Sequence, residues 1–191
     1  EDILDISKRI HSFSDWKKVW IQHAEKAEEE GRVKNAAIYY RAAEFYITQN
    51  DPDKINFYDK FIDLFYQSFK DDKLECFKIP YEHSYLHSFK VPVKKDEKKG
   101  TILMHGGFDS FVEEFYFMMR LFSDAGYEVI AYEGPGQGGS RRKYDLGWDE
   151  KWEKPTSAVL DYFKIDDATI FGLSMGGHLC FRAAAFEPRI K

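Results

Sequence analysis

Cysteine is scarce in this 191-residue chain, and two cysteines, Cys76 and Cys180, are too few for a disulfide framework. Their spacing is not that of a metal site, so we expect both to be small buried hydrophobic residues. Long apolar runs are also lacking, which argues against a membrane span. The segment Glu1 to Asp5 has neither the positive charge nor the apolar core of a signal peptide. We therefore expect a soluble, cytoplasmic protein that does not bind membranes.

Positive charge is in deficit, because 28 lysines and arginines face 33 aspartates and glutamates, giving a net charge of -5. Nucleic acids and anionic membranes attract proteins through a positive field, so neither is an expected partner. Apolar side chains, in contrast, make up 43% of the residues, and aromatic ones 17%. This is ample for a packed core, so the chain is expected to be globular.

From Ser12 to about Lys70, apolar residues recur with the period of a helix. Two such stripes are Trp16, Trp20, His23, Ala27 and Ala36, Tyr40, Ala43, Ile47. The pattern predicts three amphipathic helices, with a break at Gly31 and a helix start at Asp51 and Pro52, as N-cap and first helical residue. No second copy recurs at a fixed period, so we expect a small all-α helical domain over residues 1–72 rather than a repeat array.

After residue 72 the pattern alternates between strands and helices. The expected strands are residues 74–80, 84–93, 101–104, 127–132 and 168–171. The charged segment 94–100 is expected to be a hairpin connection between the second and third strands. Alternating β and α elements predict a mostly parallel sheet covered on both faces, so the fold class of residues 73–191 is α/β.

The fifth strand runs into Gly172-Leu173-Ser174-Met175-Gly176, a G-x-S-x-G pattern. In a nucleophile elbow the chain turns from strand to helix so sharply that the serine is strained and its hydroxyl projects from the sheet. Gly172 and Gly176 supply the clearance that this turn needs. The pattern alone is weak, but a strand precedes it and a helical apolar face follows it. We therefore interpret Ser174 as a catalytic nucleophile.

The third strand ends at His105-Gly106-Gly107-Phe108. In α/β serine hydrolases, one oxyanion donor is the amide after the nucleophile and the other comes from the loop after the third strand. The backbone amides of Met175 and of Gly107 or Phe108 occupy these positions. Two amides aimed at a developing negative charge stabilise a tetrahedral intermediate. The alternative is a glycine turn that only leads into a helix.

A second glycine-rich segment, residues 133–140, contains G-x-G-x-x-G at Gly134, Gly136 and Gly139. This pattern after a strand is typical of dinucleotide sites. The residues that follow are polar and aperiodic, so no helix is expected to open there and receive a pyrophosphate. We expect neither a cofactor nor a metal, but a tight loop that borders the active site.

The motifs HGGFDS, YEGPGQGGS and GLSMGG, in this order behind a helical domain, resemble the α/β-hydrolase family that contains 2,6-dihydroxypseudooxynicotine hydrolase and acylaminoacyl-peptidase-like proteins. The resemblance covers nearly the whole chain. It implies that Ser174 is the nucleophile, that Met175 with Gly107 or Phe108 forms the oxyanion hole, and that the helical domain covers the site and in some relatives mediates dimerisation. It further implies hydrolysis of ester, amide or activated carbon–carbon bonds in a small-molecule or peptide substrate.

The chain departs from the family in one respect. The triad order is serine, then acid, then histidine, yet only 17 residues follow Ser174. His178 should point away from the serine hydroxyl, and His105 is expected to hold its loop, so we interpret the chain as the first half of an enzyme. Two other functions remain open: a non-catalytic protein that binds partners through the helical domain, and an acyltransferase that uses the same residues.

Overall fold

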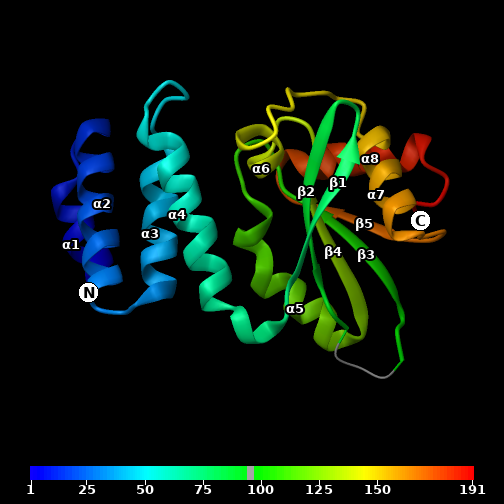
Figure 1. Cartoon of the computed structure of the whole chain (residues 1–191), viewed down its shortest axis with the longest axis horizontal. Coiled ribbons are helices and arrows are strands. Elements are labelled where there is room, and N and C mark those ends of the chain that lie inside the picture. Colours follow the sequence, from blue (N-terminus) through cyan, green and yellow to red (C-terminus); the bar gives the residue numbers. More distant parts are fainter. Residues whose placement is uncertain (94–96) are drawn as a thin grey trace. The chain divides into compact units, whose positions relative to one another are not determined.

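The computed structural model describes residues 1–93 and 97–191 (Figure 1). The chain divides into two compact units, Glu1–Asp72 and Lys73–Lys191. The first contains only helices and the second combines helices with a five-stranded sheet, so the predicted α/β class, preceded by helices, is confirmed. Within the described ranges, no helix combines the length and apolar character needed to cross a bilayer.

The first unit consists of α1 (Asp2–Arg9), α2 (Phe13–Glu29), α3 (Val33–Phe45), α4 (Asp53–Ser68) and the short 3-10 turn η1 (Lys70–Asp72). The three predicted helices are present, and Gly31 lies between α2 and α3 with a φ of 71°, which favours glycine. The last of these helices begins slightly later than predicted, with Pro52 as N-cap. Asp51 still caps its first turn, because Oδ1 accepts a hydrogen bond of 2.9 Å from the Asp53 amide.

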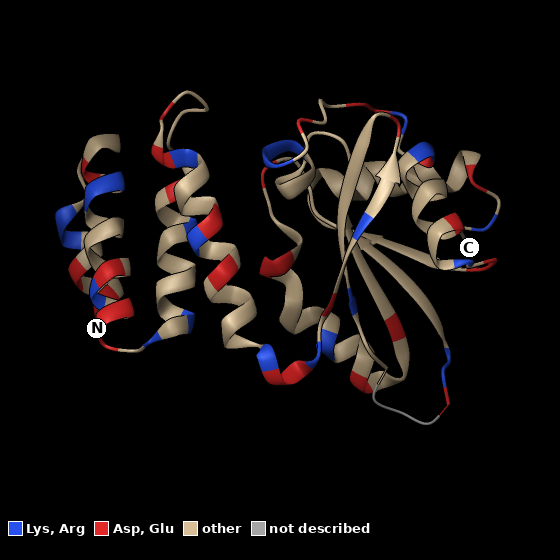
Figure 2. Ribbon diagram, in the orientation of Figure 1, with Lys and Arg blue, Asp and Glu red and all other residues tan. Residues whose placement is uncertain are grey.

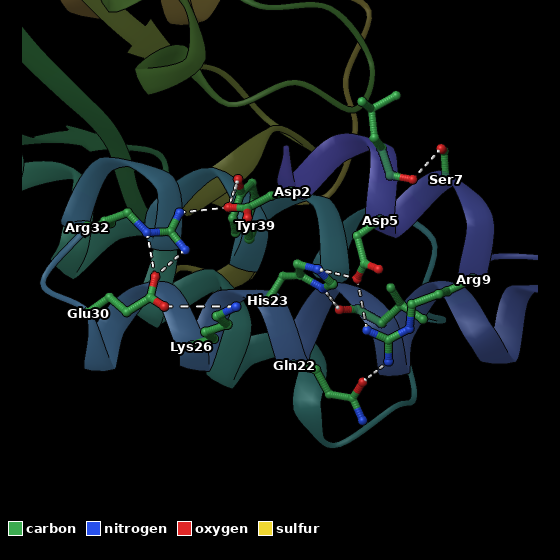
Figure 3. A network of polar contacts seen from close by, with 12 residues as sticks. Asp2, Asp5, Ser7, Arg9, Gln22, His23, Lys26, Glu30, Arg32 and Tyr39 are labelled. Atoms are coloured by element: carbon green, nitrogen blue, oxygen red, sulfur yellow. Dashed lines mark hydrogen bonds and ion pairs between the residues drawn. The ribbon is translucent and has the colours of Figure 1, made fainter.

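Helix α1 was not predicted, and polar contacts explain why. Ile6 is its only buried residue, so α1 has no stripe of buried apolar side chains to reveal it. Asp2 accepts hydrogen bonds from Arg32 at 2.7 Å and from Tyr39 at 2.9 Å, and Asp5 lies 3.1 Å from Nε2 of His23 (Figure 3). Figure 2 shows acidic and basic residues interspersed along the helices of this unit.

The sheet of the second unit has the order β1-β2-β4-β3-β5. Its elements are β1 (Glu75–Tyr81), β2 (Ser84–Val91), β3 (Gly100–His105), η2 (Val112–Phe115), α5 (Tyr116–Ala125), β4 (Tyr127–Glu133), α6 (Gly138–Arg142), α7 (Glu153–Phe163), β5 (Thr169–Gly172) and α8 (Met175–Phe186). Strand β3 pairs in parallel with both β4 and β5, whereas β1 pairs antiparallel with β2 and β2 pairs antiparallel with β4. The sheet is therefore mixed, with its parallel part at the end that carries β5.

The predicted hairpin between the second and third strands is wrong. Strand β4 lies between β2 and β3, so these two strands are not neighbours in the sheet. The tight hairpin instead joins β1 to β2, where Tyr81 pairs with Ser84. Residues 94–96 of the predicted connection lie outside the described residues. Charge in a connecting segment indicates exposure to solvent but does not tell which strands are neighbours.

Both faces of the sheet bury apolar side chains. Leu103 and Ile130, opposite one another on β3 and β4, belong to a core that includes Leu160 of α7 and Leu179 of α8. Alternate residues of a strand point to opposite faces, and helix α5 lies against β4 and β2 with Met119 fully buried. The parallel strands β4, β3 and β5 are thus fixed by packing, and the residues that follow their carboxyl ends build the site.

Candidate active site

Only Leu173 and Ser174 join strand β5 to helix α8. Ser174 has a φ of 55° and a ψ of -126°, a conformation that non-glycine residues avoid because Cβ crowds the backbone. The Leu173 amide donates to the His105 carbonyl at 3.3 Å, which ties the turn to the end of β3. Ser174 is exposed. The predicted nucleophile therefore lies at a strained, solvent-facing turn between strand and helix.

The two elbow glycines lie so close to neighbouring atoms that neither position has room for a side chain. A Cβ on Gly172 would lie 2.3 Å from the Gly176 carbonyl oxygen and 2.7 Å from Sγ of Cys180. A Cβ on Gly176 would lie 2.5 Å from the carbonyl oxygen of Gly106. Because most of these obstacles are backbone atoms, no rotamer change can relieve them. The tight turn at Ser174 therefore depends on glycine at both positions.

The loop after β3 contacts the serine turn directly. A Cβ on Gly107 would lie 2.9 Å from Cβ of Ser174 and 3.2 Å from the Met175 amide nitrogen. Met175 is the first residue of α8, where a backbone N–H has no acceptor within the helix. The Gly107 amide donates to Oγ of Ser110 at 2.9 Å. Of the two alternatives predicted for the loop donor, the Gly107 amide is thus already engaged in a hydrogen bond within its own loop.

Neither nearby histidine is hydrogen-bonded to the serine in the described part of the chain. His105 is buried, its Nδ1 lies 3.0 Å from the Gly106 carbonyl, and burial lowers its pKa to about 4. His178 is an exposed residue of α8. In the part of the chain that the structure describes, no histidine is hydrogen-bonded to Ser174. His105 is a neutral group that holds the loop.

The glycine-rich loop after β4 differs from its prediction in one respect. A short helix, α6, does open at Gly138, where no helix was expected. One of its amino-terminal amides is already used, because the Glu133 side chain accepts from the Gly139 amide. A Cβ on Gly138 would overlap the Glu133 carboxylate, and Gly136 has a φ of 85°. The Glu133 carboxyl group thus lies at the amino terminus of α6, where a dinucleotide would put its phosphates.

Sequence reasoning missed a buried polar cluster at the end of β4, which we call the Glu133 cluster: His87, Glu113 and Glu133. His87 Nε2 lies 2.9 Å from Oε1 of Glu113. Burial alone lowers the pKa of His87, but the hydrogen bond and charge of Glu113 outweigh it and raise that pKa to about 9. Burial, and then the Glu113 charge, raise the pKa of Glu133 to about 7. The one signal in the sequence was an acidic residue that directly follows a buried strand.

The Glu133 cluster lies behind the loops and holds them. Glu133 Oε1 accepts from the Val112 amide at 3.3 Å, and its backbone carbonyl accepts from Oγ of Ser140. The His87 amide donates to the same Oγ at 3.0 Å. Among residues 1–93 and 97–191, no three His, Cys, Asp or Glu side chains are arranged to hold a metal ion. The cluster is best understood as scaffold.

The remaining predictions have mixed outcomes. Cys76 was expected to be buried and is exposed, because it lies on β1 at the edge of the sheet, and Cys180 is partly buried. Arg141, considered for an anionic substrate, pairs with Asp145. Arg142 lies 5.1 Å from the ring centroid of Phe111. These arginines are engaged within their own unit.

An aromatic stack begins beside the serine turn. Phe108 is exposed, and its ring centroid lies 6.1 Å from that of Trp148, which stacks on Trp152 at 5.9 Å. Trp152 is fully buried and lies 5.2 Å from the ring of His105. The stack leads from the loop next to Ser174 into the core, so the exposed rings at its outer end rest on a rigid base.

Comparison with known proteins gives consistent results. Residues 102–191 match the sequence profile of the alpha/beta hydrolase fold. The chain is 32% identical to Hydrolase LUC6 of Fusarium sp. and 36% identical to 20-hydroxy-prefusarin hydrolase FUS2 of Gibberella moniliformis, in each case over 92% of this chain and 50% of the relative. The chain thus spans about half the length of the curated relatives it matches.

Solved structures share the fold of both units. AbyA5 matches 99% of this chain and 55% of its own chain with a TM-score of 0.84 and 22% identity. The 2,6-dihydroxy-pseudo-oxynicotine hydrolase matches 99% of this chain and 59% of its own with a TM-score of 0.75 and 23% identity. At these identities the likeness concerns the fold. It extends over the helical part as well as the sheet, in agreement with the resemblance stated from the sequence.

Proposed function

We propose that this chain, which belongs to the α/β-hydrolase superfamily, carries the nucleophile and oxyanion hole of a serine hydrolase that works through an acyl-enzyme. The observation that carries the proposal is the strained, exposed Ser174 at the turn from β5 to α8, with the loop after β3 in contact with it. Strain of this kind is kept where the surrounding structure enforces it for function. Oγ of Ser174 gives its proton to a base and attacks the substrate carbonyl, and the tetrahedral intermediate expels the alcohol or amine leaving group, which takes up that proton. Water then hydrolyses the acyl-enzyme, releasing the acid and restoring the serine hydroxyl.

In this proposal the negative charge that develops on the carbonyl oxygen is held by the amides of Phe108 and Met175. Each N–H donates one hydrogen bond that strengthens as the oxygen becomes an anion. The positive end of the α8 dipole, at Met175, adds to the stabilisation. Because the turn and the loop are packed against one another, this arrangement is in place before the substrate arrives.

Ser174 must give its proton to a base. Among residues 1–93 and 97–191, no histidine is hydrogen-bonded to it. We propose that the histidine and its acidic partner are contributed by sequence beyond Lys191, in line with relatives about twice as long. Without them the elbow and its amides would retain only a small part of the activity. The experiments below therefore use the complete protein that carries these residues.

We propose an acyl or activated carbonyl compound of small size as the substrate. Two similar proteins are named after the compounds 20-hydroxy-prefusarin and 2,6-dihydroxy-pseudo-oxynicotine. The exposed rings of Phe108 and Trp148 next to the serine turn offer an apolar surface on which such a compound could rest.

A fluorophosphonate probe tests the proposal, because an activated serine displaces its fluoride and becomes phosphonylated. The complete protein should be labelled, and Ser174→Ala should abolish labelling and lower kcat/KM for a nitrophenyl ester by about 10⁴-fold or more. Ser68→Ala, which removes a hydroxyl from α4 of the helical unit, is the matched control and should leave both unchanged. Labelling that survives in Ser174→Ala would refute the assignment. If the protein is labelled but transfers the acyl group of its substrate to an acceptor other than water, it is an acyltransferase.

A further inference from the structure

The β4–α6 loop sends one buried side chain, that of Gln137, into the oxyanion loop. Nε2 of Gln137 donates to the carbonyl oxygens of Gly106 at 2.9 Å and Gly107 at 2.7 Å. Its Oε1 accepts from the Gly134 amide at 3.1 Å. The side chain is 1% exposed, and all of its polar atoms are used. The orientation of the side-chain amide follows from this network, because a flipped amide would place its oxygen against two carbonyl oxygens.

These bonds fix the direction of a particular backbone amide. The carbonyl of Gly107 and the N–H of Phe108 belong to one peptide unit, and no described peptide bond is cis. In a trans unit the C=O and the N–H point in opposite directions. Since the Gly107 carbonyl points at Gln137, the Phe108 N–H points away from Gln137.

The preceding peptide unit is fixed in the same way. The carbonyl of Gly106 also points at Gln137, and the amide of Gly107 donates to Ser110 at 2.9 Å. Gly107 itself lies against Ser174 and the Met175 amide. A Cβ on Gly107 would lie 2.9 Å from Cβ of Ser174 and 3.2 Å from the Met175 nitrogen. Both carbonyls that could repel a developing oxyanion are therefore turned towards Gln137, and one amide, that of Phe108, is left to face the reaction.

We infer that Gln137 is the positioning residue of the oxyanion hole: it orients the Gly107–Phe108 peptide so that the Phe108 amide can stabilise the transition state. This inference rests on the proposed serine-hydrolase function. Gln137 does not touch the substrate, and its effect is transmitted by the peptide that it holds. A hydrogen bond to the carbonyl also polarises the peptide and strengthens its N–H as a donor.

The test compares Gln137→Met, which keeps the length of the side chain but cannot donate, with Ser84→Ala. Ser84 donates to the carbonyl of Tyr144 at 2.7 Å, so its loss loosens the segment after α6 without touching the oxyanion loop. Gln137→Met should lower kcat by about 10- to 100-fold with little change in KM. Its affinity for a trifluoromethyl ketone, which forms a tetrahedral adduct, should fall in proportion to kcat/KM. Ser84→Ala should change neither.

A second variant keeps the inference testable if Gln137→Met fails to fold. In Gln137→Glu the protonated carboxyl can still donate one hydrogen bond, whereas the ionised carboxylate would face two carbonyl oxygens. Its kcat should therefore fall as the pH rises, relative to that of the wild type at each pH. A purely structural role would not produce this pH-dependent difference.

The outcomes separate the two proposals. If Ser174→Ala remains active, the serine-hydrolase function fails and the role of Gln137 falls with it. If Ser174→Ala is inactive but folded Gln137→Met and Gln137→Glu keep wild-type kcat and analogue affinity, the function stands and the role of Gln137 is overturned. Equal losses of kcat in Gln137→Met and Ser84→Ala would likewise reduce Gln137 to a structural residue.

Discussion

Two polar clusters, one in each unit, differ sharply in their exposure to water. The α1 cluster of the helical unit joins Asp2, Asp5 and Arg9 of α1 to His23 and Arg32, and most of its side chains reach solvent (Figure 3). The Glu133 cluster of the α/β unit, defined above, has both carboxylates buried. The α1 cluster attaches a helix to the outside of its unit, whereas the Glu133 cluster holds the loops that carry the site.

The comparison teaches that similar ion pairs do not have similar energetic weight. At the surface, water takes the place of a lost partner, and salt screens the attraction. In the interior a charge that loses its partner has no such replacement, so removing one member costs far more than the pair contributes. We therefore expect the two clusters to respond very differently to substitution, pH and salt.

The largest effect is expected from His87→Gln. This change removes the only cationic member of the Glu133 cluster and leaves Glu113 and Glu133 facing one another without it. It should lower the free energy of unfolding by about 3 to 5 kcal/mol at pH 7. Urea denaturation measures this loss. Since the carboxyls can take up protons instead, the loss should shrink towards pH 5, and a loss that is independent of pH would contradict the electrostatic explanation.

Much of the candidate site could be predicted from the sequence, but the side chains that hold its loops in place could not. The glycines around Ser174 and the apolar strand before it are local signals, and the structure places a strained turn there. The alternatives Gly107 and Phe108 could not be separated from the sequence, because the choice that we propose depends on Ser110 and Gln137, which reach the loop only in the folded chain. Side-chain hydrogen bonds between distant segments leave no periodic trace.

The errors have a common physical origin. The short helix α6 is set by the Glu133 carboxylate at its amino terminus, and α1 by its contacts to Arg32 and Tyr39. In both cases a polar contact from elsewhere in the unit decides the local structure, where intrinsic propensity is weak. The strand order that separates β2 from β3 is likewise a tertiary choice.

The next largest effect is expected from pH. The pKa of His87 is raised to about 9 in the folded chain, so its stabilisation is complete below its ordinary value of 6.5 and is lost as the pH rises through 9. Glu133, with a pKa raised from 4.5 to about 7, also loses stabilisation as the pH rises, but at a lower pH. The free energy of unfolding should fall between pH 7 and 9 with a slope of up to about 1.4 kcal/mol per pH unit.

Urea denaturation at pH 6, 7.5 and 9 measures this slope, and His87→Gln is the control in which it should flatten above pH 7. His105 acts in the opposite direction. Burial lowers its pKa to about 4, so its contribution is present above pH 6.5 and is lost as the pH falls through 4. A wild-type curve that is flat from pH 7 to 9 would mean that His87 is not held in its charged form.

The smallest effect is expected from Arg32→Ala in the α1 cluster. Arg32 lies 2.7 Å from Asp2 and 2.6 Å from Glu30, and these ion pairs raise its pKa further above its ordinary value. Because the pairs are partly exposed to water, their loss should lower stability far less than His87→Gln does, and the difference from wild type should decrease further in high salt. Hydrogen exchange of the α1 amides should nevertheless accelerate, since α1 buries only Ile6 and depends on these contacts. If the exchange rate of the α1 amides is unchanged in Arg32→Ala, Ile6 alone attaches the helix. The difference between the two clusters would then depend on packing rather than on the exposure of their charges.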